Sequence, residues 1–234
     1  MRRLLENGAN SSFVNRITDP AVAPADLVAD PVATVAGFDF KPHPRIPQPA
    51  ALYGEERKNS MGVNLANDDE LRQLAEAVNA AVKPWQAAPL VPGVQASAAT
   101  QAVTNPADRR EQVGTWQAAD AAIVERALQN AVAAQPAWDA LPATSRAKVL
   151  EHAADLLQAR LPQFIALCVK EAGKTLPDAI AEVREAIDFL RYYAQQARAV
   201  LAQPETLPGP TGESNQLFLH GRGVFVCISP WNFP

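Results

Sequence analysis

The stretch GVFVCISPWNFP occupies residues 223–234, where an apolar run meets a short segment bracketed by two prolines. The run is apolar almost throughout, which is typical of a strand covered on both faces in a parallel sheet. In open α/β sheets, ligands bind outside the carboxyl ends of the strands. Asn232 follows such an end, and an amide NH2 held there can donate a hydrogen bond to an oxyanion. The alternative is an ordinary turn in which Asn232 bonds its own backbone.

The region before this stretch is predicted to be strongly helical. The longest predicted helix opens at Pro177, and its apolar residues recur at spacings of three and four: Ile180, Val183, Ile187 and Leu190. Pro162 suits the first position of the preceding helix, and Gly173 suits its C-terminal cap. A helix is predicted from about Thr144. The residues expected to face the core are Val149, Leu150, Ala153, Leu156 and Leu157.

Further helices and short strands are predicted on either side of this region. Asp120 can cap a helix that carries Val124, Leu128 and Val132, and Asn67 can cap another with an acidic first turn. Residues 99–116, ATQAVTNPADRREQVGTW, read as two short strands around a turn at residues 105–108. The stretches QLFLH (216–220) and GVFVCIS (223–229) are predicted as strands joined by Gly221-Arg222-Gly223.

The composition limits the classes of function. With 234 residues and 48% hydrophobic content, the chain can bury a sizeable core. The formal net charge of −4 shows no basic excess, so nucleic acid and anionic membranes are poor candidates as partners. No apolar stretch reaches the roughly 20 residues that a bilayer span needs.

The few cysteines and histidines suggest no site of their own. The two cysteines show neither metal spacing nor a disulfide framework, so a reducing cytoplasm is the expected location. Cys168 is predicted on the apolar side of a helix and Cys227 inside a strand, both as inert core residues. His43, His152 and His220 are scattered, and no metal site is predicted.

Residues 228–234, ISPWNFP, resemble the signature of the aldehyde dehydrogenase superfamily, and residues 103–234 are similar to the opening of its catalytic domain. The helix at residues 171–194 also resembles the long helix that precedes the cofactor fold in that superfamily. The resemblance implies that Asn232 helps to bind the oxyanion of a thiohemiacetal. It also implies that four residues border the nicotinamide side of NAD: Ile228, Ser229, Pro230 and Trp231. The implied fold class is α/β, mostly helical, with an incomplete Rossmann-like sheet.

The N-terminal stretch RRLLENGANSSFVNRI, residues 2–17, resembles the final barrel helix of a proline dehydrogenase. The resemblance implies that Arg2 and Arg3 grip the carboxylate of proline and that Glu6 supports them. A guanidinium fork does bind a carboxylate bidentately. Without the resemblance, the three residues would read as a solvated helix face with ion pairs at i,i+3 and i,i+4.

The order of these parts along the chain resembles the layout of the bifunctional proline utilisation A family. Residues 1–17 would be the tail of the proline dehydrogenase barrel, and residues 18–66 a Pro-rich linker, since prolines crowd between Pro20 and Pro49. Residues 67–234 would be the truncated N-terminal part of the aldehyde dehydrogenase domain. Such a parent protein oxidises proline with FAD and then oxidises L-glutamate γ-semialdehyde to glutamate with NAD.

The expected partners are therefore small-molecule substrates and the remainder of the parent polypeptide. Homo-oligomerisation and peripheral membrane association of the parent stay open. The chain itself is expected to be an inactive piece, since most of the barrel, the nucleophilic cysteine and the general-base glutamate are not in it. Two alternatives remain: a stand-alone NAD(P)-dependent aldehyde dehydrogenase of other specificity, and a non-catalytic helical interaction module.

Overall fold

The computed structural model describes residues 13–230, 232 and 233, and the chain divides between Leu52 and Tyr53 into two compact units. The first unit contains short helical segments: α2 (Phe13–Ile17), α3 (Pro24–Leu27), α4 (Pro31–Ala36) and the 3-10 turn η1 (Pro49–Ala51). The last three each have proline in the first turn, where its missing N–H costs no hydrogen bond. All are short, and none of the described residues in this unit is buried.

The second unit begins inside the predicted linker, because residues 53–66 are attached to helix α9 (Leu176–Leu201). Ser60 is buried, and its N–H and Oγ–H donate to the two carboxylate oxygens of Asp188 at 2.7 and 2.8 Å. The Arg191 guanidinium donates to the backbone carbonyl of Asn59 at 3.1 Å. These polar contacts order the last part of that segment. Nothing in the Pro- and Ala-rich sequence indicated them.

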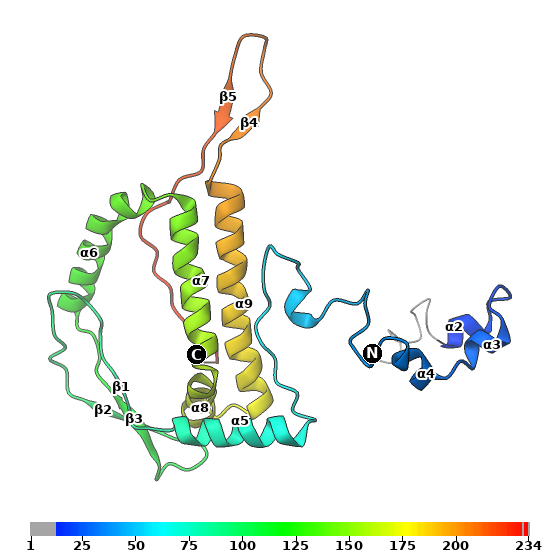
Figure 1. Cartoon of the computed structure of the whole chain (residues 1–234). Helices are drawn as coiled ribbons and strands as arrows, with labels where there is room; N and C mark the ends of the chain where they lie inside the picture. The colour runs from blue at the N-terminus through cyan, green and yellow to red at the C-terminus, as the bar shows by residue number, and fades with distance from the viewer. Residues whose placement is uncertain (1–12, 231, 234) are drawn as a thin grey trace. The chain divides into compact units, whose positions relative to one another are not determined.

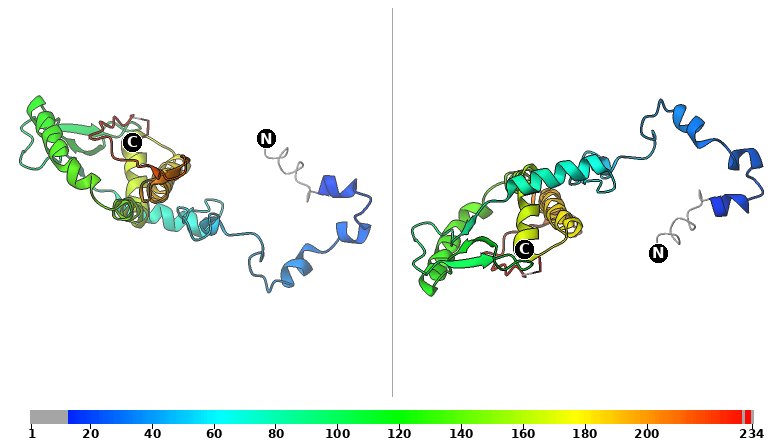
Figure 2. Two further views of the ribbon diagram at one scale, coloured as in Figure 1. Left: turned by 90° about the horizontal axis from the view of Figure 1, so that it is seen from above. Right: turned by 90° about the horizontal axis from the view of Figure 1, so that it is seen from below.

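Four helices form the core of the second unit: α5 (Asp68–Ala81), α7 (Ala143–Ala159), α8 (Leu161–Ala172) and α9. Figure 1 shows α7 beside α9, with α5 crossing near α8, and Figure 2 shows the α7 and α9 pair nearly end-on. The predicted caps are confirmed, since Asn67 accepts hydrogen bonds at the start of α5 and Gly173 ends α8 with φ 66°. The predicted apolar stripe of α9 is also confirmed, because Ile180, Val183 and Ile187 are buried.

The inward face of α7 differs from the prediction. Ala143, Ala147 and Ala154 are the buried residues of α7, whereas Val149 and Leu156 are exposed. Ala147, Ala154, and Ala194 of α9, are fully buried. Small side chains allow close packing of the two helices. The prediction holds in part, because Leu157 packs against the core cluster and Leu150 and Ala153 are half-buried.

A small sheet lies beside the helices, with β3 (Gln112–Trp116) between β1 (Trp85–Ala87) and β2 (Gln101–Thr104). The predicted antiparallel pair β2–β3 is confirmed. Strand β1, which pairs in parallel with β3, was not predicted because the sequence around it is rich in proline. A Cβ at Gly114 would collide with the Trp85 carbonyl oxygen, so this close pairing requires glycine. Helix α6 (Ala121–Asp139) follows, capped by Asp120 as predicted, and Ile123 is its buried residue.

The C-terminal part departs most from the prediction. A hairpin of β4 (Glu205–Leu207) and β5 (Asn215–Leu217) projects from the end of α9 (Figure 1). The predicted strands QLFLH and GVFVCIS are otherwise wrong, because residues 218–230 are not in a strand. A strand requires a neighbouring backbone to bond, and no described strand pairs with this run. Without a strand to cover them, Val224, Val226 and Ile228 are 40%, 75% and 89% exposed.

A bidentate ion pair joins α7 to α9 and gives a pH-dependent prediction. Both Arg198 terminal nitrogens donate to the Glu151 carboxylate, at 2.6 and 2.7 Å. The hydrogen bond from Arg198 holds the pKa of Glu151 below its ordinary value of 4.5. Because the folded-state pKa is the lower one, the stabilisation is present above about pH 4.5 and is lost as the pH falls through the folded-state value.

We therefore expect Glu151→Gln to lower the free energy of unfolding by up to about 1 kcal/mol at pH 7, since both side chains are partly exposed and screened. Urea unfolding at pH 7 and pH 4 would show the two proteins converging at the lower pH. The matched control is Asp69→Asn, which removes the more exposed Asp69–Arg72 pair and should have little effect. If the loss of unfolding free energy in Glu151→Gln became larger as the pH falls, the stabilising role given to the Glu151–Arg198 pair would be contradicted.

Candidate active-site segment

The segment around Asn232 forms an exposed turn. The Phe233 N–H donates to the Pro230 carbonyl at 3.1 Å, which closes the turn around Asn232. Asn232 is exposed, and its carboxamide makes no hydrogen bond to the part of the chain that the structure describes. The alternative of a side chain bonded to its own turn stays open, because Trp231 of the same turn lies outside the described residues.

The predicted cofactor-binding residues lie on the same segment. Ile228, Ser229 and Pro230 are exposed and outside regular structure, whereas Trp231 lies outside the described residues. The backbone of these three residues is exposed and therefore accessible to a ligand. The sequence has no Gly-x-Gly-x-x-Gly run, so it supplies no glycine-rich turn of the type that cradles a pyrophosphate.

The turn that joins α8 to α9 lies next to the Asn232 segment. Gly173 adopts a left-handed conformation, and the Lys174 N–H donates to the Cys168 carbonyl at 3.2 Å. Thr175 then caps α9 by accepting from the Asp178 N–H. A Cβ at Gly173 would lie 2.9 Å from Cγ of Pro106, so the turn is also closely packed.

Lys174 connects this turn to the Asn232 segment. Its Nζ is 2.6 Å from Oε2 of Glu182 and 5.6 Å from the centroid of the Phe233 ring. The Lys174 and Glu182 side chains are only 18% and 14% exposed. The hydrogen bond with Glu182 raises the pKa of Lys174, so the ammonium stays charged at neutral pH. No sequence pattern pointed to Lys174, because the contact joins residues far apart in the chain.

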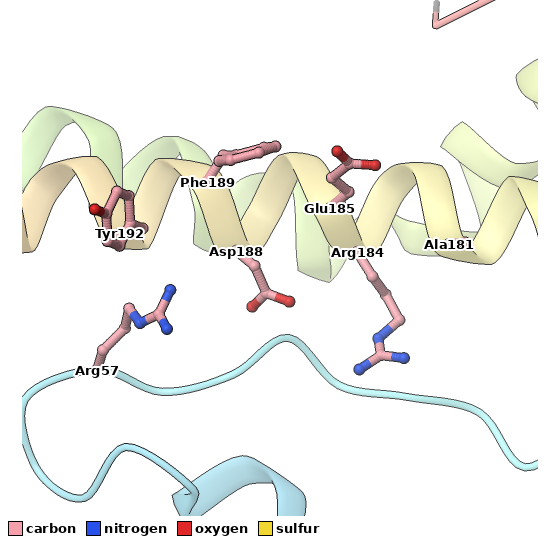
Figure 3. A pocket seen from close by; sticks show the side chains of 7 residues that line it. All are labelled: Arg57, Ala181, Arg184, Glu185, Asp188, Phe189 and Tyr192. Atoms are coloured by element: carbon pink, nitrogen blue, oxygen red, sulfur yellow. The ribbon is translucent and has the colours of Figure 1, made fainter. Parts of the chain in front are cut away.

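A groove of about 530 Å³ runs along α9, and sequence reasoning did not identify it (Figure 3). Its lining consists of two arginines, two acids, two aromatic residues and an alanine: Arg57, Arg184, Glu185, Asp188, Phe189, Tyr192 and Ala181. The Arg57 guanidinium lies 4.0 Å from the Tyr53 ring centroid and 5.5 Å from that of Tyr192. All the lining residues except Arg57 are on α9, at spacings of three, four or one residue. This helical spacing places them on one side of α9 and could have indicated the groove from the sequence.

The remaining predicted residues have mixed outcomes. Arg2, Arg3 and Glu6 lie outside the described residues. Cys168 is buried as predicted, and burial raises the pKa of its thiol. Cys227 is exposed, which corrects its prediction as a core residue, because the strand expected to contain it does not form.

The described part of the chain holds neither a metal site nor a membrane span. No group of three or more metal-ligating side chains occurs among the described residues, and the histidines belong to none. Nδ1 of His220 lies 3.8 Å from Oδ2 of Asp139. Within the same residues, no helix has the length and apolar character needed to cross a bilayer.

Comparison with known proteins places these features in a family. The sequence profile of the aldehyde dehydrogenase family matches residues 94–234, more than half of the chain. The chain belongs to the aldehyde dehydrogenase family. Its fold is the α/β aldehyde dehydrogenase fold, which confirms the fold class predicted from ISPWNFP and the helix before it.

Relatives of this aldehyde dehydrogenase chain extend over its whole length. It is 45% identical over 241 residues to the bifunctional protein PutA of Escherichia coli K12, covering 100% of this chain and 17% of PutA. The crystal structure of a proline utilization A mutant from Bradyrhizobium japonicum is 41% identical with a TM-score of 0.71, and covers 100% of this chain and 20% of that one. A Thermus 1-pyrroline-5-carboxylate dehydrogenase with bound NAD is 32% identical with a TM-score of 0.67, covering 75% and 35%. The chain thus spans about one-fifth of its bifunctional relatives.

Proposed function

We propose that this chain is part of a bifunctional enzyme of proline catabolism. The longer polypeptide would oxidise proline with FAD, and then oxidise L-glutamate γ-semialdehyde to glutamate with NAD. Its partners would be these small-molecule substrates and the remainder of the same polypeptide. This chain would contribute the end of the proline dehydrogenase part, the connecting segment and the beginning of the aldehyde dehydrogenase domain.

One observation carries the proposal: the PutA relatives align with all of this chain, including the residues before the family match at residue 94. The Thermus dehydrogenase aligns with only 75% of it. A stand-alone aldehyde dehydrogenase would have no reason to share the N-terminal stretch, so this difference favours the bifunctional enzyme. It also supports a role for Arg2, Arg3 and Glu6 in holding the carboxylate of proline.

The exposed turn supports a division of roles within the dehydrogenase site. Asn232 would donate its side-chain N–H to the oxyanion that develops on the aldehyde oxygen. Ile228, Ser229, Pro230 and Trp231 would form part of the wall against the nicotinamide. NAD, when bound, accepts the hydride of the aldehyde. The residues of this chain would orient the reacting groups and stabilise charge.

The isolated 234-residue chain should form no NADH from proline, glutamate semialdehyde or acetaldehyde. Covalent aldehyde oxidation needs an activated thiolate and a base in addition to a bound nicotinamide. Cys168 is buried with a raised pKa, and Cys227 lies on an exposed segment without a neighbouring base among the described residues. Absorbance at 340 nm with each substrate tests the expectation.

The same assay on the longer polypeptide is the positive control, and it should favour glutamate semialdehyde over acetaldehyde in kcat/KM. NADH formation by the isolated chain would contradict the proposed division of the enzyme. A longer polypeptide that preferred acetaldehyde would contradict the proposed substrate instead.

A further inference from the structure

The contact between Lys174 and Phe233 lies beside the residue proposed to bind the oxyanion. Phe233 follows Asn232 directly, and its N–H closes the turn by donating to the Pro230 carbonyl at 3.1 Å. The Lys174 ammonium lies 5.6 Å from the centroid of the Phe233 ring, within the range of a cation–π interaction. The ammonium thus contacts one of the two residues that close the turn.

Lys174 is itself held in place from two directions. Its backbone N–H is bonded to the Cys168 carbonyl at the end of α8, and its Nζ is 2.6 Å from Glu182 on α9. Both side chains of this ion pair are mostly buried, at 18% and 14% exposed. The cation therefore has a fixed position relative to the two helices, whereas Phe233 and Asn232 are exposed.

We propose that Lys174 is a positioning residue, whose ammonium, fixed by Glu182, holds the Phe233 ring and thereby directs the Asn232 side chain. The inference rests on the function proposed for Asn232. An oxyanion donor is effective only when its direction is set before the charge develops. A small displacement of such a group is costly, so a fixed cation beside an exposed turn can affect the rate without touching the substrate.

The first test measures the turn itself in the 234-residue chain. Selective 15N labelling of phenylalanine gives eight amides, one of which is Phe233. Hydrogen exchange of the Phe233 amide should become about two- to fivefold faster in Lys174→Met, as expected for losing an exposed cation–π contact. Lys174→Arg keeps a cation over the ring and should exchange as the wild type does.

Two further variants separate this role from the loss of any ion pair. Lys170→Met removes the nearby ion pair of 2.8 Å between Lys170 on α8 and Glu111, and should leave the Phe233 amide unchanged. Lys174→Met/Glu182→Gln removes the cation without leaving a carboxylate unpaired, and should exchange as fast as Lys174→Met. Faster exchange in Lys170→Met, or wild-type exchange in the double variant, would overturn the proposal.

The second test measures the reaction in the longer polypeptide. Lys174→Met should lower the single-turnover rate of NADH formation about two- to fivefold, which corresponds to about 0.4–1 kcal/mol at 1.36 kcal/mol per factor of ten. The Kd for NAD should not change, and Lys174→Arg should restore the rate. An unchanged rate in Lys174→Met, or an equal loss in Lys174→Arg, would overturn the proposal. If the wild-type polypeptide oxidises no aldehyde, the proposed function fails, and the exchange experiment still decides whether Lys174 holds the turn.

Discussion

Asn232→Ala in the longer polypeptide should lower kcat for glutamate semialdehyde by about 100- to 1,000-fold, the usual effect of removing one oxyanion donor. The exposed carboxamide has no described protein partner to lose, so the change removes a donor without leaving a buried group unpaired. The Kd for NAD should stay within about twofold, because the donor acts on charge that develops only during the reaction. The loss should therefore appear in kcat and not in cofactor binding.

Single-turnover NADH formation and fluorescence titration with NAD measure the two quantities separately. The matched control is Asn130→Ala on α6, which removes another exposed carboxamide, one that donates to the Pro92 carbonyl at 3.1 Å. That control should have wild-type kcat. A single-turnover rate unchanged in Asn232→Ala would disprove the role given to Asn232, and weaker NAD binding would instead indicate a role in holding the cofactor.

Ile187→Ala should lower the free energy of unfolding of the 234-residue chain by about 2–5 kcal/mol. Ile187 is fully buried in α9 and belongs to the cluster formed with Leu74, Ile165 and Val183. Truncation removes apolar contacts and leaves a cavity among helices that pack closely. Of the described side chains, Ile165 and Ile187 are the largest that are fully buried, so the effect should be among the greatest for a single substitution.

Urea unfolding followed by circular dichroism measures this loss. Val149→Ala on α7 is the matched control, because Val149 is 53% exposed, and its effect should stay within about 0.5 kcal/mol. If Val149→Ala were as destabilising as Ile187→Ala, the face of α7 assigned to the core would be wrong. An Ile187→Ala loss below about 1 kcal/mol would show that α9 is not packed as described.

The helices could be predicted from the sequence because their signals are local. Asn67 and Asp120 bond the N–H groups of the turns that they cap, and Gly173 adopts the conformation that ends α8. The face of α7 could not be predicted in this way. Alanine carries little hydrophobic signal, so the pattern pointed to Val149 and Leu156 and missed the alanines that let α7 approach α9.

The strand at residues 223–229 shows a different limit. An apolar run indicates burial, but a strand also requires a neighbour, and no described strand bonds to this run. For the candidate site, the motif identified Asn232, whereas Lys174 was missed because its contact with Phe233 depends on the tertiary fold. Arg57 was missed for the same reason, since α9 and the segment before α5 meet only in the folded chain.

We propose above that this chain belongs to an enzyme that converts proline to glutamate. The most direct measurement supplies 13C-labelled L-proline, NAD and a quinone that reoxidises the reduced FAD to the purified longer polypeptide, and follows both 13C-glutamate and NADH. We predict that both form in equal amounts without any added enzyme. A polypeptide that reduces NAD with other aldehydes but yields no 13C-glutamate, from either labelled proline or labelled glutamate semialdehyde, would contradict the claim.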